Sequence, residues 1–267
     1  MTAEPIRPSV FIAVPAYGQI VTGQTCTSLI GLTRALLQNG MAGGFGTLSF
    51  PDISEIRNIF LTIWYDTIKS SHLLFIDADM GFDPQLVLDM LAFDKPLVGA
   101  LCPKRKLPIE FAGRAKAGNC RIVNGHMEVD GVGGAVMLIR RDAVDAILAK
   151  DPELIDEVTV KNHAARELLD QHKITRLLRP FDKLVVNRET FSEDLSFCIR
   201  YRQATGGDVW ANIMHKITHV GPHEFSGQYY EHIKDMIRPE PGEEGTPTPS
   251  LEAIPPEVQA ALMQAAG

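Results

Sequence analysis

Two aspartates, Asp77 and Asp79, follow directly after the apolar run Leu73–Ile76. Four consecutive apolar residues indicate a buried strand, and the carboxylates would stand at its C-terminal end. Open α/β sheets bind their ligands at this end of the strands. Because unpaired carboxylates are costly to bury, a hard divalent cation would neutralise them and would accept phosphate oxygens as further ligands. The pair therefore predicts a metal–phosphate site, although two such residues can also simply cap the next helix.

Two other kinds of Asp-rich motif can be tested against these residues. An EF-hand calcium loop that began at Asp77 would need glycine at its sixth position and glutamate at its twelfth. Phe82 and Leu88 stand at these positions, so the EF-hand interpretation fails. A haloacid-dehalogenase-like phosphatase would use Asp77 as its nucleophile, but it expects Thr or Val where this chain has Gly81. The phosphatase interpretation is weakened and stays open.

Two further signals lie later in the chain. Glu193 and Asp194 stand in the first turn of a helix that we expect to begin after Ser192, where acids are also common because they complement the helix dipole. His219 follows near the end of a predicted strand, where a lone histidine is more often structural than a ligand. Together with Asp79, these residues would supply a metal carboxylate, a base and a metal imidazole.

Composition narrows the class of protein. The chain has 267 residues, is 45% hydrophobic and carries a formal net charge of −7, which argues against a surface devoted to nucleic acid. A local basic patch remains at Lys104-Arg105-Lys106, although such a run is usually a solvated turn. The four cysteines show neither metal-ligand spacing nor a disulfide framework. No apolar run reaches the roughly 20 residues of a membrane span, and we expect a cytoplasmic protein.

Strands and helices alternate through the first hundred residues. This alternation predicts an α/β fold with a mostly parallel central sheet and helices on both faces. We expect strands at 10–14, 45–50, 73–76 and 97–101, and helices at 24–39, 54–69 (with Ser54 as N-cap) and from 84 onward. After residue 102 the expected elements are short strands at 109–112, 120–124 and 126–129, helices at 142–149, 160–171 and 193–204, and strands at 208–213 and 216–220. Residues 1–237 would form one domain, and 238–267, rich in Pro and Glu, a flexible tail.

Five short motifs occur in an order typical of GT-A glycosyltransferases. They are Pro15-Ala16-Tyr17 after the first strand, Asp77-Ala78-Asp79, the glycine pair Gly133-Gly134 before a strand, Glu193-Asp194 at a helix start, and His219-Val220-Gly221. The chain resembles this family over about residues 9–232, and most of all its small stand-alone bacterial and phage members of the family-2-like type. The resemblance implies a Rossmann-like sheet with a small antiparallel part on the acceptor side.

The resemblance also implies a nucleotide-sugar donor, most simply a UDP-sugar. The loop residues Pro15, Ala16 and Tyr17 would border the base. Arg57 would contact the nucleotide, unless it belongs to a solvated helix face. Asp77, with Ala78 beside it, would meet the ribose or a metal-bound water. Gly133 and Gly134 would let the backbone approach the donor sugar, unless they only form a tight turn.

For catalysis, the resemblance implies that Asp79 and His219 hold Mn²⁺ or Mg²⁺, with His215 as the fallback ligand. Asp194 would deprotonate the acceptor hydroxyl and Glu193 would orient the acceptor, which suggests inversion at the anomeric carbon. The acceptor stays open between a saccharide, a small molecule and a hydroxymethylated DNA base, as phage relatives suggest. The basic patch at Lys104-Arg105-Lys106 could hold phosphate. A non-catalytic nucleotide- or glycan-binding module is a further alternative.

Overall fold

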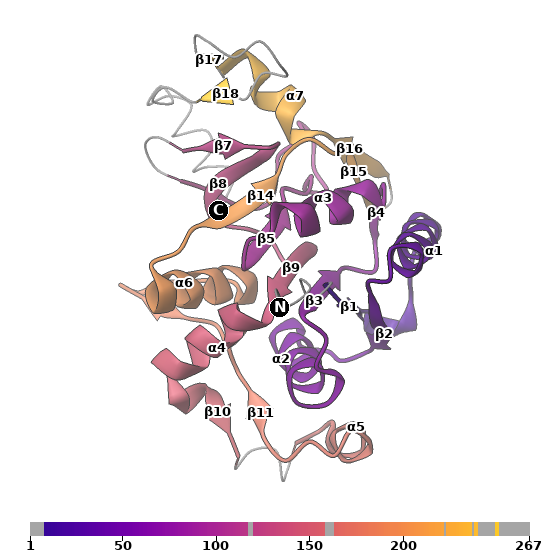
Figure 1. Cartoon of the computed structure of the whole chain (residues 1–267), viewed down its shortest axis with the longest axis vertical. Coiled ribbons are helices and arrows are strands. Elements are labelled where there is room, and N and C mark those ends of the chain that lie inside the picture. Colours follow the sequence, from indigo (N-terminus) through magenta and orange to yellow (C-terminus); the bar gives the residue numbers. More distant parts are fainter. Residues whose placement is uncertain are drawn as a thin grey trace, which may run out of the picture.

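The computed structural model describes residues 8–116, 120–157, 163–221, 223–236, 238–239 and 249–250. Within these residues, nine strands form one central sheet (Figure 1). They are β1 (Val10–Pro15), β2 (Ala42–Leu48), β3 (His72–Ile76), β5 (Leu97–Ala100), β6 (Arg114–Ala115), β7 (Ile122–Val123), β8 (His126–Gly131), β9 (Val136–Arg140) and β14 (Val209–Asn212). Their order is β2-β1-β3-β9-β5-β14-β8-β6, and β7 pairs with β8.

Most strands of this sheet run in the same direction, and only β8 and β9 run the opposite way. β1 runs parallel to β2 and β3, and β5 runs parallel to β14. β9 lies antiparallel between β3 and β5, and β8 runs antiparallel to β14, β6 and β7. The α/β fold class predicted from the sequence is therefore confirmed.

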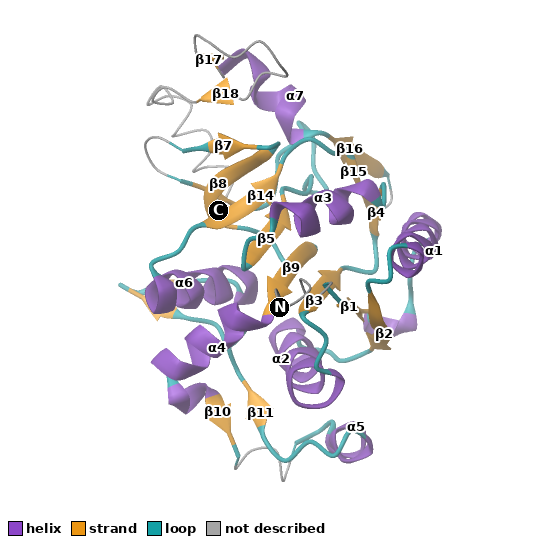
Figure 2. Cartoon of the chain, viewed as in Figure 1, coloured by secondary structure: helices purple, strands orange, loops and turns teal. Residues whose placement is uncertain are grey.

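Helices cover both faces of the sheet, and Figure 2 shows the strands between them. One face carries α1 (Gly23–Gln38) and α3 (Gln85–Phe93), and the other carries α2 (Ile53–Ile63), α4 (Arg141–Lys150) and α6 (Glu193–Thr205). Alternate residues of β3 pack on opposite faces of the sheet. Leu74 and Ile76 pack in the core with α1 and α3, whereas Leu73 and Phe75 pack in the core with α2, α4 and α6. Side chains of a strand point to opposite faces in turn, so a sheet covered on both faces needs a continuous apolar run.

The remaining elements are short. A second sheet joins β4 (Met80–Phe82), β15 (Ile217–Val220) and β16 (Glu224–Gly227). Three strand pairs are β10 (Ile155–Asp156) with β11 (Leu177–Leu178), β12 (Val185–Val186) with β13 (Glu189–Thr190), and β17 (Arg238–Pro239) with β18 (Pro249–Ser250). The small helices are α5 (Arg166–Gln171), α7 (Tyr229–Ile233), 3-10 turns at Tyr17–Gln19, Pro152–Leu154 and Lys234–Met236, and a π-helical turn at Trp64–Ile68. No helix in the described part of the chain is long and apolar enough to cross a membrane.

Several predicted boundaries are wrong, each for a local reason. Asp52, not Ser54, caps α2, because its side chain accepts a hydrogen bond from the Glu55 amide at 3.0 Å. The α-helical part of this segment ends at Ile63, where the π-helical turn takes over. The strand expected at 109–112 lies instead at β6, since this stretch closes a loop through an isolated bridge between Pro103 and Phe111. Of the tail proposed at 238–267, only β17 and β18 lie among the described residues.

Candidate active site

The second sheet brings Asp79 and His219 together. β4 begins at the residue after Asp79, and its antiparallel pairing with β15 sets His219 opposite Met80. The Val220 amide also donates to the Asp79 carbonyl at 2.8 Å. As a result, the His219 Nε2 atom lies 3.5 Å from Asp79 Oδ1. Two residues that are 140 positions apart in the chain thus face one point at the C-terminal edge of β3.

A backbone contact fixes which ring nitrogen of His219 carries hydrogen. Its Nδ1 atom lies 2.8 Å from the Pro103 carbonyl oxygen, which can only accept a hydrogen bond. Nδ1 therefore donates, and the lone pair of Nε2 points toward Asp79. Burial lowers the pKa of His219, the Pro103 contact opposes this, and the Arg105 charge adds to the lowering. A lowered pKa favours the neutral ring, which is the form that binds a metal.

Asp79 and His219 could hold part of a metal shell. Among the described residues there is no group of three or more His, Cys, Asp and Glu side chains with metal-binding geometry. One carboxylate and one imidazole suit a divalent ion that takes its other ligands from phosphate oxygens and water. The fallback ligand is not available in this arrangement, because His215 Nε2 pairs with Asp89 of α3 at 2.8 Å.

The basic patch after β5, which the sequence suggested as a phosphate contact, contains a residue that reaches Asp79. The Arg105 guanidinium forms an ion pair with Asp79 Oδ2. Its two neighbours turn to another acid, with the Lys106 and Lys104 ammonium groups beside the Glu110 carboxylate. A basic run close after the fourth predicted strand was the available signal, but it does not indicate which of the three side chains would reach Asp79.

Arg57 is the centre of a buried charge network. Its side chain is 2% exposed, so the solvated helix face considered from the sequence is wrong. Its Nη2 atom donates to Asp77 Oδ1 at 2.9 Å and its Nη1 atom to the Gly134 carbonyl at 3.0 Å. Its Nε atom lies 3.4 Å from Glu193 Oε1. Burial favours the neutral guanidine, but the carboxylates around it, Asp77 first, raise the pKa of Arg57 above its ordinary value.

The glycine pair before β9 differs in its surroundings. Because β9 is antiparallel to β3, the start of β9 lies beside the end of β3, and the Asp77 amide donates to the Ala135 carbonyl. A Cβ atom at Gly134 would come within 2.4 Å of the Arg57 Cζ atom. At Gly133 it would meet nothing closer than 3.6 Å. Gly134 is therefore required by Arg57 itself, whereas a Cβ atom at Gly133 would make only ordinary contacts.

The start of α6 closes the network. Asp194 Oδ2 accepts a hydrogen bond from the Gly134 amide at 2.9 Å, and its Oδ1 atom accepts from the Leu195 amide and from the Ser192 hydroxyl. Asp194 remains partly exposed, whereas Glu193 is buried. Burial, followed by repulsion from Asp194, raises the pKa of Glu193. Of the two acids predicted to act in catalysis, Asp194 is the more exposed.

The first loop lies at the next strand end. Pro15 ends β1, and the Ala16 amide donates to the Leu48 carbonyl at 2.8 Å, which buries Ala16 against β2. Tyr17 is 75% exposed. At the end of β2, Leu48 and the next two residues, Ser49 and Phe50, line a hollow of about 540 Å³ together with residues of α5. Since Ser49 also accepts from the Gly18 amide, the loop with Tyr17 lies beside this hollow.

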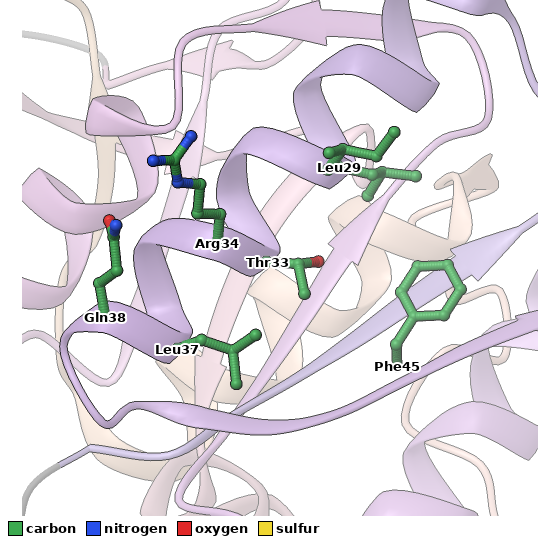
Figure 3. Close-up of a pocket in the computed structure, with 7 residues that line it drawn as sticks. Leu29, Thr33, Arg34, Leu37, Gln38 and Phe45 are labelled. Carbon is green, nitrogen blue, oxygen red and sulfur yellow. The ribbon is translucent and has the colours of Figure 1, made fainter.

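A second hollow contains none of the predicted site residues. This groove, of about 610 Å³, runs between α1 and the edge strand β2 (Figure 3). Its lining is mainly apolar, with Leu29, Leu37 and Phe45, and its charged member is Arg34. It offers no carboxylate or imidazole, so the chemistry of the chain gathers at the end of β3 instead.

Comparison with known proteins gives only remote structural similarity. No family model matches the chain, and no curated protein matches it. Among solved structures, A197 from STIV has 17% sequence identity and a TM-score of 0.47, with 83% of this chain and 90% of that chain covered. Mannose-1-phosphate geranyltransferase from Thermus thermophilus has 11% identity and a TM-score of 0.35, with 78% and 74% covered. HddC from Yersinia pseudotuberculosis has 8% identity and a TM-score of 0.28, with 50% and 77% covered. Similarity this low assigns no activity.

Proposed function

We propose that the chain is a metal-dependent glycosyltransferase that moves a sugar from a nucleotide donor, most simply a UDP-sugar, to an acceptor hydroxyl. The observation that carries the proposal is the meeting of Asp79 and His219, because Asp79 Oδ1 lies 3.5 Å from His219 Nε2. Partial, mixed O,N donor sets at the C-terminal end of a strand suit a cation shared with a diphosphate. The ion, Mn²⁺ or Mg²⁺, would neutralise the charge that develops on the leaving diphosphate.

The neighbouring residues would orient the donor. In the proposed complex, the base lies along the exposed Tyr17 ring and the ribose meets Asp77, whose carboxylate Arg57 holds in place at 2.9 Å. The Arg57 side chain is buried, so we assign it a positioning role in place of the direct nucleotide contact suggested by the resemblance. The donor sugar would lie over Gly133, where an added Cβ atom would meet nothing closer than 3.6 Å.

The transfer step is a displacement at the anomeric carbon. The acceptor oxygen forms a bond to that carbon, while the bond from the carbon to the diphosphate oxygen breaks and its electron pair leaves with the nucleoside diphosphate. The acceptor proton goes to the Asp194 carboxylate, which is partly exposed and is held by the Gly134 amide. Glu193, being buried against Arg57, would act through Arg57 and not by touching the acceptor.

Binding of nucleoside diphosphates tests the proposal. We expect UDP to raise the melting temperature of the full chain in the presence of Mn²⁺ and to do so much less without it, because a ligand stabilises the state that it binds. Asp79→Asn should remove this effect. Asp89→Asn is a matched control, since Asp89 also pairs with a histidine, His215, and should leave the effect intact.

The alternatives give different results in the same preparation. A glycosyltransferase should slowly release UDP from a UDP-sugar in Mn²⁺, whereas a binding module should bind without release. A phosphatase that used Asp77 should hydrolyse an aryl phosphate and ignore UDP. Gly81 stands where the phosphatase family expects Thr or Val, and this mismatch disfavours the phosphatase. Wild-type protein that binds no nucleoside diphosphate in Mn²⁺ would refute the proposed function.

A further inference from the structure

Arg105 competes for the carboxylate at the centre of the proposed site. Its guanidinium is paired with Asp79 Oδ2, while Asp79 Oδ1 faces His219. The side chain of Asp79 is 24% exposed, so in the absence of another cation Arg105 supplies the charge that neutralises it. A divalent ion bound to Asp79 and His219 would have to share this carboxylate with a second positive charge.

We propose that Arg105 is an exchangeable counter-charge that leaves Asp79 when the metal arrives with a diphosphate and then binds the diphosphate oxygens. This inference rests on the proposed function and adds a residue and a linkage to it. The guanidinium fork fits phosphate oxygens in a bidentate manner, and a phosphate offers it more negative charge than one carboxylate does. A metal ion alone would displace the Arg105 guanidinium from Asp79 without offering it another partner, whereas a metal ion with a diphosphate provides a new partner.

The loop that carries Arg105 permits the side chain to move while the backbone stays anchored. The Lys104 amide donates to the Glu110 carbonyl at 2.6 Å, and the Ala112 amide donates to the Cys102 carbonyl at 2.7 Å. The Arg105 side chain itself is 43% exposed. These backbone contacts hold the residue next to the site, while the guanidinium can exchange one partner for another.

Two residues on β15 and just after it keep the Arg105 stem beside the metal ligands. The Pro103 carbonyl, two residues before Arg105, accepts from His219 and so ties this loop to the proposed imidazole ligand. Gly221 leaves the space that the stem occupies, since a Cβ atom there would lie 3.1 Å from Arg105 Cδ. The guanidinium therefore has a short path between Asp79 and any diphosphate that shares the metal.

The exchange predicts opposite effects of one substitution on two binding constants. In Arg105→Ala, Mn²⁺ alone should bind about threefold more tightly, because a weak, partly exposed competitor is lost. UDP in saturating Mn²⁺ should bind about tenfold more weakly, because a charged hydrogen bond to phosphate is lost. The coupling between metal and UDP should fall accordingly, and by linkage it should fall equally whichever ligand is titrated first.

The concentration of free Mn²⁺ can be measured by electron paramagnetic resonance, and UDP binding can be measured by calorimetry on the full chain. Lys106→Ala is the matched control. It removes the same charge at the next position, where the Lys106 side chain pairs with Glu110. We expect this variant to match the wild type in both titrations. Arg105→Lys, which keeps the charge but lacks the fork, should hold Mn²⁺ binding near the wild-type value and recover only part of the UDP affinity.

Changes of the same sign in both constants for Arg105→Ala, or no change in either, would overturn the role of Arg105. So would the absence of Mn²⁺ binding to both the wild type and the variant in the metal-only titration. These results differ from failure of the proposed function, in which the wild type itself binds no UDP in Mn²⁺.

Discussion

Replacing Gly134 by alanine should damage the site through a single added methyl group. The new Cβ atom would lie 2.4 Å from Arg57 Cζ and 2.5 Å and 2.7 Å from its two terminal nitrogens. Non-bonded carbon atoms normally rest about 3.5 Å apart, so the guanidinium must retreat by about 1 Å. The backbone at Gly134 is not left-handed, so alanine itself fits the local conformation and the clash is the only direct cost.

Arg57 has no room for that retreat. Its side chain is 2% exposed, its Cζ atom lies 5.1 Å from the centre of the Phe75 ring, and Asp77 holds it at 2.9 Å. Overpacking typically costs about 1–3 kcal/mol and a broken buried ion pair about 3–5 kcal/mol. We therefore expect the free energy of unfolding to fall by about 3 kcal/mol, which for a chain of this size lowers the melting temperature by about 6–12 °C.

Thermal and urea unfolding of Gly134→Ala would measure this loss, and Gly133→Ala is the neighbouring control. A Cβ atom at Gly133 meets Ala112 and Asp194 at 3.6 Å, an ordinary contact. The control should keep its stability within about 0.5 kcal/mol of the wild type. If the donor covers Gly133, the control should lose UDP-sugar affinity while staying folded. A Gly134→Ala variant as stable as the wild type would refute the view that Gly134 exists to admit Arg57.

Three further results are expected. Asp194→Asn should lower turnover by at least about 100-fold and leave UDP affinity within about twofold, because the amide oxygen can still accept from the Gly134 amide; normal turnover would remove Asp194 from the mechanism. Chelation of divalent ions with EDTA should abolish the rise in melting temperature caused by UDP, and added Mn²⁺ should restore it; a rise that survives EDTA would contradict metal-assisted binding. Burial, followed by the Arg140 charge, lowers the pKa of His72 to about 4, so the unfolded chain takes up the proton first as the pH falls from about 6.5. The free energy of unfolding of the wild type should then decline between these pH values by up to about 1.4 kcal/mol per pH unit. His72→Asn should reduce this slope, whereas substitution of the exposed His232 by Asn should leave it unchanged.

Much of the fold could be predicted because its signals are local. The run Leu73–Ile76 and the spaced leucines of α1 record which faces must be buried, and the structure has a strand and a helix there. The edge strand was placed late, at 45–50, because the glycines of β2 hide the pattern at its true start, Ala42. Cap chemistry misled for a similar reason, since both Asp52 and Ser54 are residues that favour N-caps.

The candidate residues were identified from the sequence, but their partners were not. The positions of Asp77, Asp79, Asp194 and His219 on strand ends and a helix start were predicted, and their roles remain predictions. The pairing of Arg57 with Asp77 and the bond from Gly134 to Asp194 join residues 20 and 60 apart in the chain. Such contacts depend on which strands become neighbours.

Local patterns of residues are enough to specify an α/β sheet covered on both faces, with acids at the end of a buried strand. The reason is that the periodicity of apolar residues and the positions of charges can be read directly from the sequence. Long-range strand pairing, in contrast, sets β9 antiparallel between β3 and β5 and joins β4 to β15. The first pairing places Gly134 against Arg57, and the second places His219 beside Asp79. Strand pairing is chosen by the packing of the whole core, which no local pattern of residues specifies.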